Sequence, residues 1–156
     1  MVTVLECCFL QNPLMKFVVQ HDAVPSVLGD HLSVIANALQ PLNPAVLYLA
    51  PPDIEGTIAQ AARERSSEWL EAVIQYHVGQ ALGRARGLHG GEGFLTFLRQ
   101  RPTLERSILD RIPVRTVVLE SAVSPERWDS VETLLTAWYA PRSMAAPGPA
   151  LTPVRT

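Results

Sequence analysis

The chain has 156 residues, of which 13 are Lys or Arg and 15 are Asp or Glu, and its formal net charge at pH 7 is −2. This length is sufficient for one domain with a hydrophobic core, and the near-neutral charge provides no general attraction to nucleic acid or to an anionic membrane. No apolar run approaches the roughly 20 residues of a membrane-spanning helix, and no basic region precedes an apolar one at the N-terminus, so we expect a cytoplasmic protein without a signal peptide.

The first predicted element is a strand at residues 2–6. Its β-branched and apolar residues suit a strand that is buried on both faces of a parallel sheet. The strand ends at Glu6, and the amide pair Gln11 and Asn12 follows a few residues later. Because ligands of open α/β sheets bind outside the carboxyl ends of the strands, an acid followed by two amides at this place predicts a functional site.

A helix and a second strand are predicted next. Pro25 suits the first position of a helix, and Pro41 ends the apolar pattern that follows it. Residues 45–50 are an uninterrupted apolar run between prolines, which predicts a second buried strand. The apolar positions of the helix recur at helical spacing, and they are Leu28, Leu32, Ile35, Ala36 and Leu39.

Two further helices and a glycine-rich connection follow. Asp53 is a candidate N-cap for a helix that continues to residue 62, and Ser66 or Ser67 is a candidate N-cap for the next helix. Glycines are dense between residues 79 and 93, and glycine lets the backbone adopt positive φ. We therefore predict a mobile connection at residues 79–93.

A third strand and a last helix complete the predicted domain. Residues 114–120 are β-branched and apolar, and a helix is predicted to begin at Pro125 behind the capping residue Ser124. From residue 141 onward the chain is rich in Pro, Ala, Gly and Ser, which predicts a disordered tail at residues 141–156. Three short strands separated by long helical segments predict an α/β domain with a parallel sheet over residues 1–140.

The polar residues near the first strand have two interpretations each. Glu6 can hold a magnesium-bound water or take a proton from a hydroxyl group, but an acid at this place can also be a helix cap or a surface residue. Gln11 and Asn12 each carry donors and acceptors that can bind the edge of a base. The alternative is a turn before Pro13, which the residues alone favour.

Two arginines form a second candidate group. Arg63 and Arg65 lie at the end of a predicted helix near the glycine-rich connection, and arginine forks match phosphate oxygens in two-point contacts. The alternative is a solvated helix face, on which they pair with Glu64, Glu68 and Glu71, and taken alone this is the better interpretation. The histidines are scattered without ligand spacing, so no metal site is predicted.

Several of these segments resemble those of P-loop nucleoside and nucleotide kinases. The segments are residues 6–13 (ECCFLQNP), residues 42–44 (LNP) before the second strand, and residues 64–69 (ERSSEW). They are similar to those of an uncharacterised bacterial group of P-loop NTPases within that superfamily. The similarity covers about residues 2–139 and corresponds to the later two-thirds of such a kinase.

The resemblance implies a three-layer P-loop-kinase-like core that uses ATP and Mg²⁺ and accepts a nucleotide or nucleoside-like small molecule. In that family, an acid at the end of the third strand acts near magnesium or the acceptor hydroxyl. The first predicted strand of this chain corresponds to that third strand, so Glu6 stands at the place of the acid. A downstream Gln contacts the acceptor base, and Gln11 is the matching residue. Arg63 and Arg65 match arginines that close over the transferring phosphate, within a lid segment at about residues 60–93.

The resemblance also assigns a nucleotide-binding role near the end of the third predicted strand. The loop after the last strand of such kinases lies against adenine, and Ser121 and Ala122 occupy that loop here. We therefore expect these two residues to contact the base of ATP.

The sequence departs from this family at the phosphate-binding loop. The motif Gly-x4-Gly-Lys-Ser/Thr is absent, Lys16 is the only lysine, and Cys7 stands where better-known kinases have an Arg after the acid. We therefore expect the C-terminal portion of a kinase-like phosphotransferase that is inactive by itself. The alternatives are a degenerate, non-catalytic module that binds a nucleotide or a protein, and a remnant without stable function. An open apolar sheet edge would also promote self-association.

Overall fold

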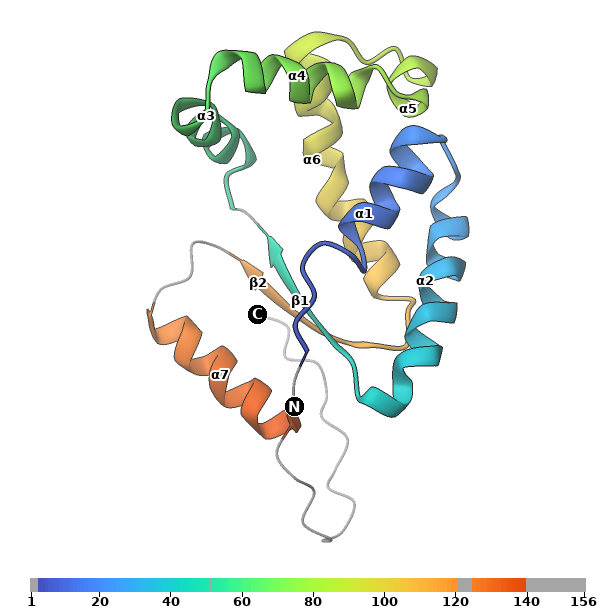
Figure 1. Cartoon of the computed structure of the whole chain (residues 1–156), viewed down its shortest axis with the longest axis vertical. Helices are drawn as coiled ribbons and strands as arrows, with labels where there is room; N and C mark the ends of the chain where they lie inside the picture. The colour runs from blue at the N-terminus through green and yellow to red at the C-terminus, as the bar shows by residue number, and fades with distance from the viewer. Residues whose placement is uncertain (1–2, 51, 121–124, 140–156) are drawn as a thin grey trace, which may run out of the picture. The chain divides into compact units, whose positions relative to one another are not determined.

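The computed structural model describes residues 3–50, 52–120 and 125–139, and it divides into two compact units, residues 1–122 and 123–156 (Figure 1). The described part of the second unit is helix α7, Pro125–Tyr139. The predicted start of this helix at Pro125 is confirmed. Its proposed cap Ser124 and the tail at residues 141–156 lie outside the described residues.

The first unit contains the remaining helices and both strands. In chain order these elements are α1 (Gln11–Leu14), η1 (Met15–Gln20), α2 (Pro25–Leu39), η2 (Gln40–Leu42), β1 (Ala45–Ala50), α3 (Ile54–Glu64), α4 (Ser67–Val78), α5 (Ala81–Ala85), α6 (Gly90–Leu109) and β2 (Arg115–Glu120). Among the helices of the described residues, none combines the length and the apolar composition that crossing a membrane requires.

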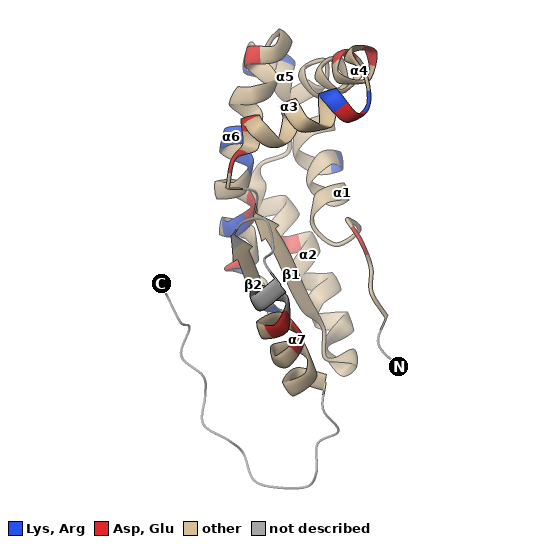
Figure 2. Ribbon diagram, turned by 90° about the vertical axis from the view of Figure 1, so that its left-hand side faces the viewer, with Lys and Arg blue, Asp and Glu red and all other residues tan. Residues whose placement is uncertain are grey.

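The two strands form a parallel sheet, which confirms the α/β class. Strand β1 pairs with β2 over its full length, with Ala45 opposite Arg115 and Ala50 opposite Glu120. A parallel pair needs a long crossover connection, and helices α3–α6 supply it. In Figures 1 and 2 helices α3, α4 and α5 lie beyond the carboxyl ends of both strands, the side on which α/β sheets bind ligands.

The prediction of a strand at residues 2–6 is wrong for its described part, residues 3–6. Val4 and Leu5 are 86% and 71% exposed, and the sheet of the described residues contains β1 and β2 alone. Figure 1 shows the N-terminal segment passing in front of β1, but Figure 2 shows it set apart from the strand.

The physical reason is that this segment has no neighbouring strand with which to form backbone hydrogen bonds. A strand forms only where its backbone groups pair with a neighbouring strand, however β-branched its residues are. The backbone hydrogen bonds at the end of this segment are local: Cys8 donates its N–H to the Glu6 carbonyl, and Asn12 donates its N–H to the Cys7 carbonyl. At Cys7 the backbone enters the left-handed region, with a φ of 60°, and ends the extended segment.

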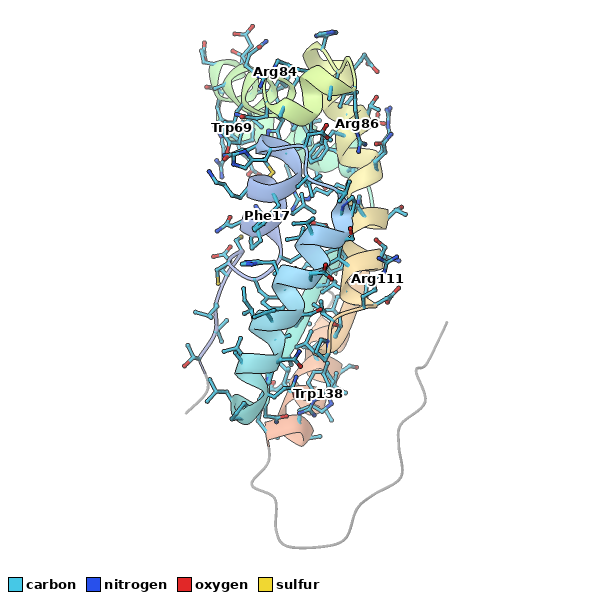
Figure 3. The ribbon with its side chains drawn as sticks, turned by 90° about the vertical axis from the view of Figure 1, so that its right-hand side faces the viewer. Phe17, Trp69, Arg84, Arg86, Arg111 and Trp138 are labelled. Carbon is cyan, nitrogen blue, oxygen red and sulfur yellow. The ribbon has the colours of Figure 1, made fainter. Side chains whose placement is uncertain are left out.

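The hydrophobic core lies between one face of the sheet and four helical segments. It joins side chains from α1–η1, α2, α5, α6 and β1, and its fully buried members include Leu14, Leu28 and Leu32. Phe17, labelled in Figure 3, adds a ring contact to His31 of α2, with 4.8 Å between the ring centroids. The predicted apolar stripe of α2 therefore faces the core.

The glycine-rich stretch is more regular than the predicted mobile connection. It begins directly after α4, at Gly79, and contains all of α5 and the start of α6. A Cβ at Gly83 would collide with the backbone carbonyl of Val78, so this glycine permits a close approach of two helices. Arg84 donates to the Gly79 carbonyl and Arg86 donates to Gln100, and both arginines are labelled in Figure 3.

We predict a large loss of stability from a substitution at Leu32 and almost none from a substitution at Leu5. Leu32→Ala should lower the free energy of unfolding by about 2–5 kcal/mol, because it opens a cavity in the core. Leu5→Asp should change it by less than about 0.5 kcal/mol, because the side chain is exposed. Urea unfolding followed by circular dichroism measures both values. A large loss for Leu5→Asp would show that residues 3–6 do belong to a packed sheet.

Candidate functional site

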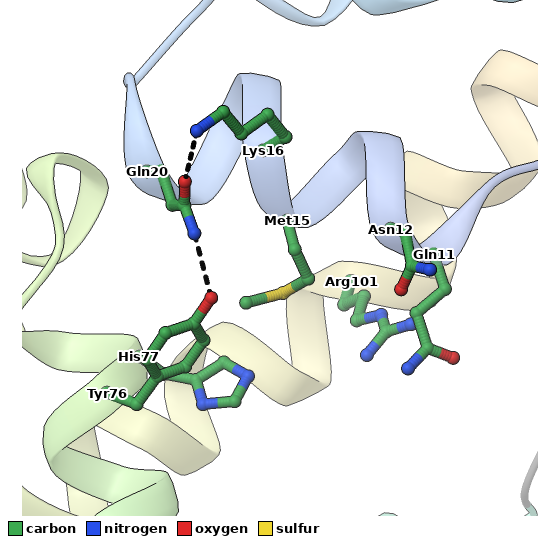
Figure 4. Close-up of a pocket in the computed structure, with 8 residues that line it drawn as sticks. All are labelled: Gln11, Asn12, Met15, Lys16, Gln20, Tyr76, His77 and Arg101. Atoms are coloured by element: carbon green, nitrogen blue, oxygen red, sulfur yellow. Dashed lines mark hydrogen bonds between the residues drawn. The ribbon is translucent and has the colours of Figure 1, made fainter. Parts of the chain in front are cut away.

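The candidate site is an open pocket of about 520 Å³ in the first unit. Three helical segments form its wall: the continuous α1–η1 helix, α4 and α6 (Figure 4). The lining residues are mostly polar, and they are Gln11, Asn12, Met15, Lys16, Gln20, Tyr76, His77 and Arg101.

The structure places both predicted amide residues in this pocket. Gln11 and Asn12 are the first two residues of α1, directly after the turn at Cys7. The Cys7 thiol donates a hydrogen bond to the Gln11 side-chain oxygen over 3.4 Å, and its carbonyl accepts the Asn12 N–H over 2.9 Å. The turn thus begins the helix and directs the two amides toward the pocket, where Figure 4 shows them beside Arg101.

The other predicted site residues do not line the pocket. Glu6 is exposed on the extended segment before α1. Arg63 lies exposed in the last turn of α3, and the guanidinium of Arg65 lies over the Trp69 ring, 4.6 Å from its centroid. The structure therefore does not bring Glu6, Arg63 and Arg65 together at the amides. Residues 121–122, the predicted adenine contact, lie outside the described residues.

A chain of hydrogen bonds holds one side of the pocket. Lys16 donates its ammonium N–H to the side-chain oxygen of Gln20 over 3.0 Å, and Gln20 donates its amide N–H to the Tyr76 hydroxyl oxygen over 2.8 Å. Because this hydroxyl accepts from Gln20, its own hydrogen remains available to a ligand. Lys16 retains two further N–H donors. This side of the pocket therefore offers donors from a cation and a hydroxyl group.

His77 is a neutral acceptor in the pocket wall. Its Nδ1 lies 2.7 Å from the Val73 carbonyl oxygen, and since a carbonyl only accepts, Nδ1 carries the proton. Burial lowers the pKa of His77, and the nearby Arg101 lowers it further, against the raising effect of the Val73 hydrogen bond. The second ring nitrogen, Nε2, therefore has a free lone pair near neutral pH.

On the opposite side of the pocket, a buried carboxylate positions Arg101. Glu105 of α6 is 4% exposed, and its two oxygens accept from Arg101 Nε and from the Tyr48 hydroxyl, each over 2.7 Å. Burial and the bond to this carboxylate raise the pKa of Tyr48 well above its usual value, so the hydroxyl stays protonated. The bond at Nε leaves the two terminal nitrogens of Arg101 for a ligand.

Six lining residues were not predicted as site residues by the sequence analysis: Met15, Lys16, Gln20, Tyr76, His77 and Arg101. A local signal existed for two pairs, because Lys16 with Gln20 and Arg101 with Glu105 have the i, i+4 spacing that places side chains on one helix face. That spacing shows which side chains are neighbours, but it does not show that the two faces meet across a pocket.

The residues of the chain do not fit the binding of ATP and Mg²⁺ that the resemblance implies. Glu6 is an isolated acid, and the described residues contain no cluster of three His, Cys, Asp or Glu side chains placed to hold a metal ion. The sequence has no phosphate-binding glycine loop. The pocket instead combines donors from cations, amides and a hydroxyl with one imidazole acceptor, which suits a small polar or anionic molecule.

Comparisons of the chain with known protein families, with curated proteins and with solved structures gave no match.

We predict a pH dependence of stability that originates at His77. The pKa of His77 is lower in the folded than in the unfolded chain, so the unfolded chain binds the proton more readily. The stability that neutral His77 provides is therefore present above pH 6.5, its ordinary pKa, and is lost as the pH falls below that value. The slope from this residue is at most about 1.4 kcal/mol per pH unit.

His77→Asn tests this effect, because Asn does not titrate and keeps a side-chain N–H. Urea unfolding between pH 5 and 8 should show a shallower slope for this variant than for the wild type. His21→Asn is the matched control, because His21 is exposed. Equal slopes for His77→Asn and the wild type would show that the imidazole does not titrate differently on folding.

Proposed function

We propose that the chain is the acceptor-binding portion of a nucleoside- or nucleotide-kinase-like phosphotransferase. It binds a nucleoside-like or nucleotide-like small molecule in the pocket between α1–η1, α4 and α6. It transfers no phosphate until a phosphate-binding loop is supplied by another segment or chain.

The observation that carries this proposal is the meeting of Gln11 and Asn12 with Arg101 in one pocket. The sequence resemblance gave Gln11 the role of contacting an acceptor base, and amide and guanidinium groups together present the donors and acceptors that a base edge requires. Of the helices that form the pocket, α4 lies beyond the carboxyl ends of β1 and β2, where α/β sheets bind ligands, whereas α1–η1 and α6 also contribute to the core on one face of the sheet (Figures 1 and 2).

A second candidate function is a non-catalytic module that binds the same kind of molecule. It is favoured by the position of Glu6, which is exposed and is not among the pocket residues. A general base has to reach the hydroxyl from which it takes a proton. If Glu6 never reaches the ligand, binding without transfer is the function of the chain.

We predict that Asn12→Ala lowers the affinity for nucleosides and nucleoside monophosphates. Loss of one ligand hydrogen bond costs about 0.5–1.5 kcal/mol, which corresponds to an affinity about 2–12-fold lower. Isothermal titration calorimetry with uridine, thymidine, UMP, dTMP and AMP measures the effect. Gln75→Ala is the control, because Gln75 is exposed on α4 and does not line the pocket. If no member of this panel binds to the wild type, the proposed function is wrong.

We also predict that the purified chain does not hydrolyse ATP or phosphorylate any member of this panel. Phosphoryl transfer depends on a phosphate loop, its Lys and a magnesium ion, and the 156 residues contain no such loop. A coupled assay for ADP release gives the rate. Turnover that disappears in Glu6→Gln would contradict this prediction and make Glu6 a catalytic residue of the chain alone.

A further inference from the structure

The pocket has two polar sides, whose cations differ in how far their charge is compensated. In Figure 4, Lys16, Gln20 and Tyr76 lie on one side, and Gln11, Asn12 and Arg101 lie on the other, with Met15 between them. Each side contains one cation, and the two cations have different partners.

The charge of Arg101 is compensated within the protein. Its Nε donates to the buried carboxylate of Glu105 over 2.7 Å, and Tyr48 donates to the same carboxylate. An ion pair at this distance acts on a ligand as a dipole rather than as a full charge, so it attracts a second anion weakly. The terminal nitrogens of Arg101 remain good donors to a neutral oxygen.

The charge of Lys16 is not compensated in the same way. Its ammonium group donates to the uncharged amide of Gln20, and that amide donates onward to Tyr76. No carboxylate is among the residues that line the pocket. His77 adds no charge of its own near neutral pH, because burial favours its neutral form.

From this difference we propose that the pocket binds the anionic group of its ligand at Lys16 and the Tyr76 hydroxyl. The uncharged hydrogen-bonding edge of the ligand then lies against Arg101, Gln11 and Asn12. The inference rests on the proposed function for the class of molecule and adds its orientation. The substrate class is a small molecule with an amide-like or base-like edge at one end and a phosphate or carboxylate group at the other.

Inorganic phosphate tests the charged side without the rest of a ligand. We expect Lys16→Gln to lower the phosphate affinity by about tenfold or more, the effect of losing a charge-assisted contact of about 1.4 kcal/mol or more. Arg101→Lys should leave the phosphate affinity within twofold, since it keeps a cation beside Glu105 and removes only the terminal donors. Arg63→Gln is the control for a cation outside the pocket. ³¹P NMR titration measures all four proteins.

UMP and uridine separate this inference from the proposed function. With the same variants, UMP affinity should fall in Lys16→Gln and become less dependent on salt, whereas uridine affinity should fall in Arg101→Lys alone. If UMP and uridine fail to bind while phosphate binding still depends on Lys16, the proposed function is wrong and the anion site stands. If UMP binds equally well to Lys16→Gln, the proposed function stands and the orientation is wrong.

The variants at Arg101 have to keep the fold for phosphate binding to be compared. Arg101→Gln alone would leave the buried Glu105 carboxylate with Tyr48 but without its cation and would destabilise the fold, so it is avoided. The double variant Arg101→Gln/Glu105→Gln removes both charges together and should still bind phosphate. Loss of phosphate binding in this folded double variant, or no phosphate binding by the wild type at millimolar concentration, would overturn the assignment of the anion to Lys16.

Discussion

The buried carboxylate of Glu105 is the constraint on which the site depends. A charge that is 4% exposed is costly unless it is paired, and Glu105 is satisfied on one oxygen by Arg101 and on the other by Tyr48. Tyr48 belongs to β1 and Arg101 belongs to the pocket, so this single carboxylate links the sheet to the site. Rotation of α6 relative to β1 would break one of the two bonds. The sheet therefore fixes the position of the Arg101 guanidinium in the pocket through Tyr48 and Glu105.

The sequence predicts the elements well where the signal is local. Asp53 caps α3 by accepting the Gly56 N–H, and Ser66 caps α4 by accepting the Trp69 N–H, as their residue types indicate. The two strands at residues 45–50 and 115–120 follow from their apolar runs. The segment at residues 3–6 is also rich in β-branched and apolar residues, but it has no partner strand. Pairing is a property of the fold and not of the segment, so composition alone could not separate the two cases.

The site could be predicted only in part, because its contacts connect distant residues. Gln20 and Tyr76 are 56 positions apart in the chain, and Tyr48 and Glu105 are 57 apart. Neither pair leaves a trace in spacing or periodicity. The amides Gln11 and Asn12 were predicted because they follow a segment taken as a strand that ends at an acid; the structure places them in the pocket, although residues 3–6 form no strand of the sheet. Arg65 was a reasonable candidate for phosphate, but its guanidinium lies over Trp69 instead, a contact that needs only four positions of separation on the chain.

The elements that supply the lining residues show what the pocket needs in order to form. Every lining residue belongs to α1, η1, α4 or α6, and none belongs to β1 or β2. The sheet affects the pocket through Tyr48 and Glu105, which are in place with the two described strands. A further strand or a phosphate loop is therefore not needed to build the pocket. Under the proposed function, the acceptor site would form and bind its ligand without the transferring loop, and that loop would add chemistry to a pocket that already exists.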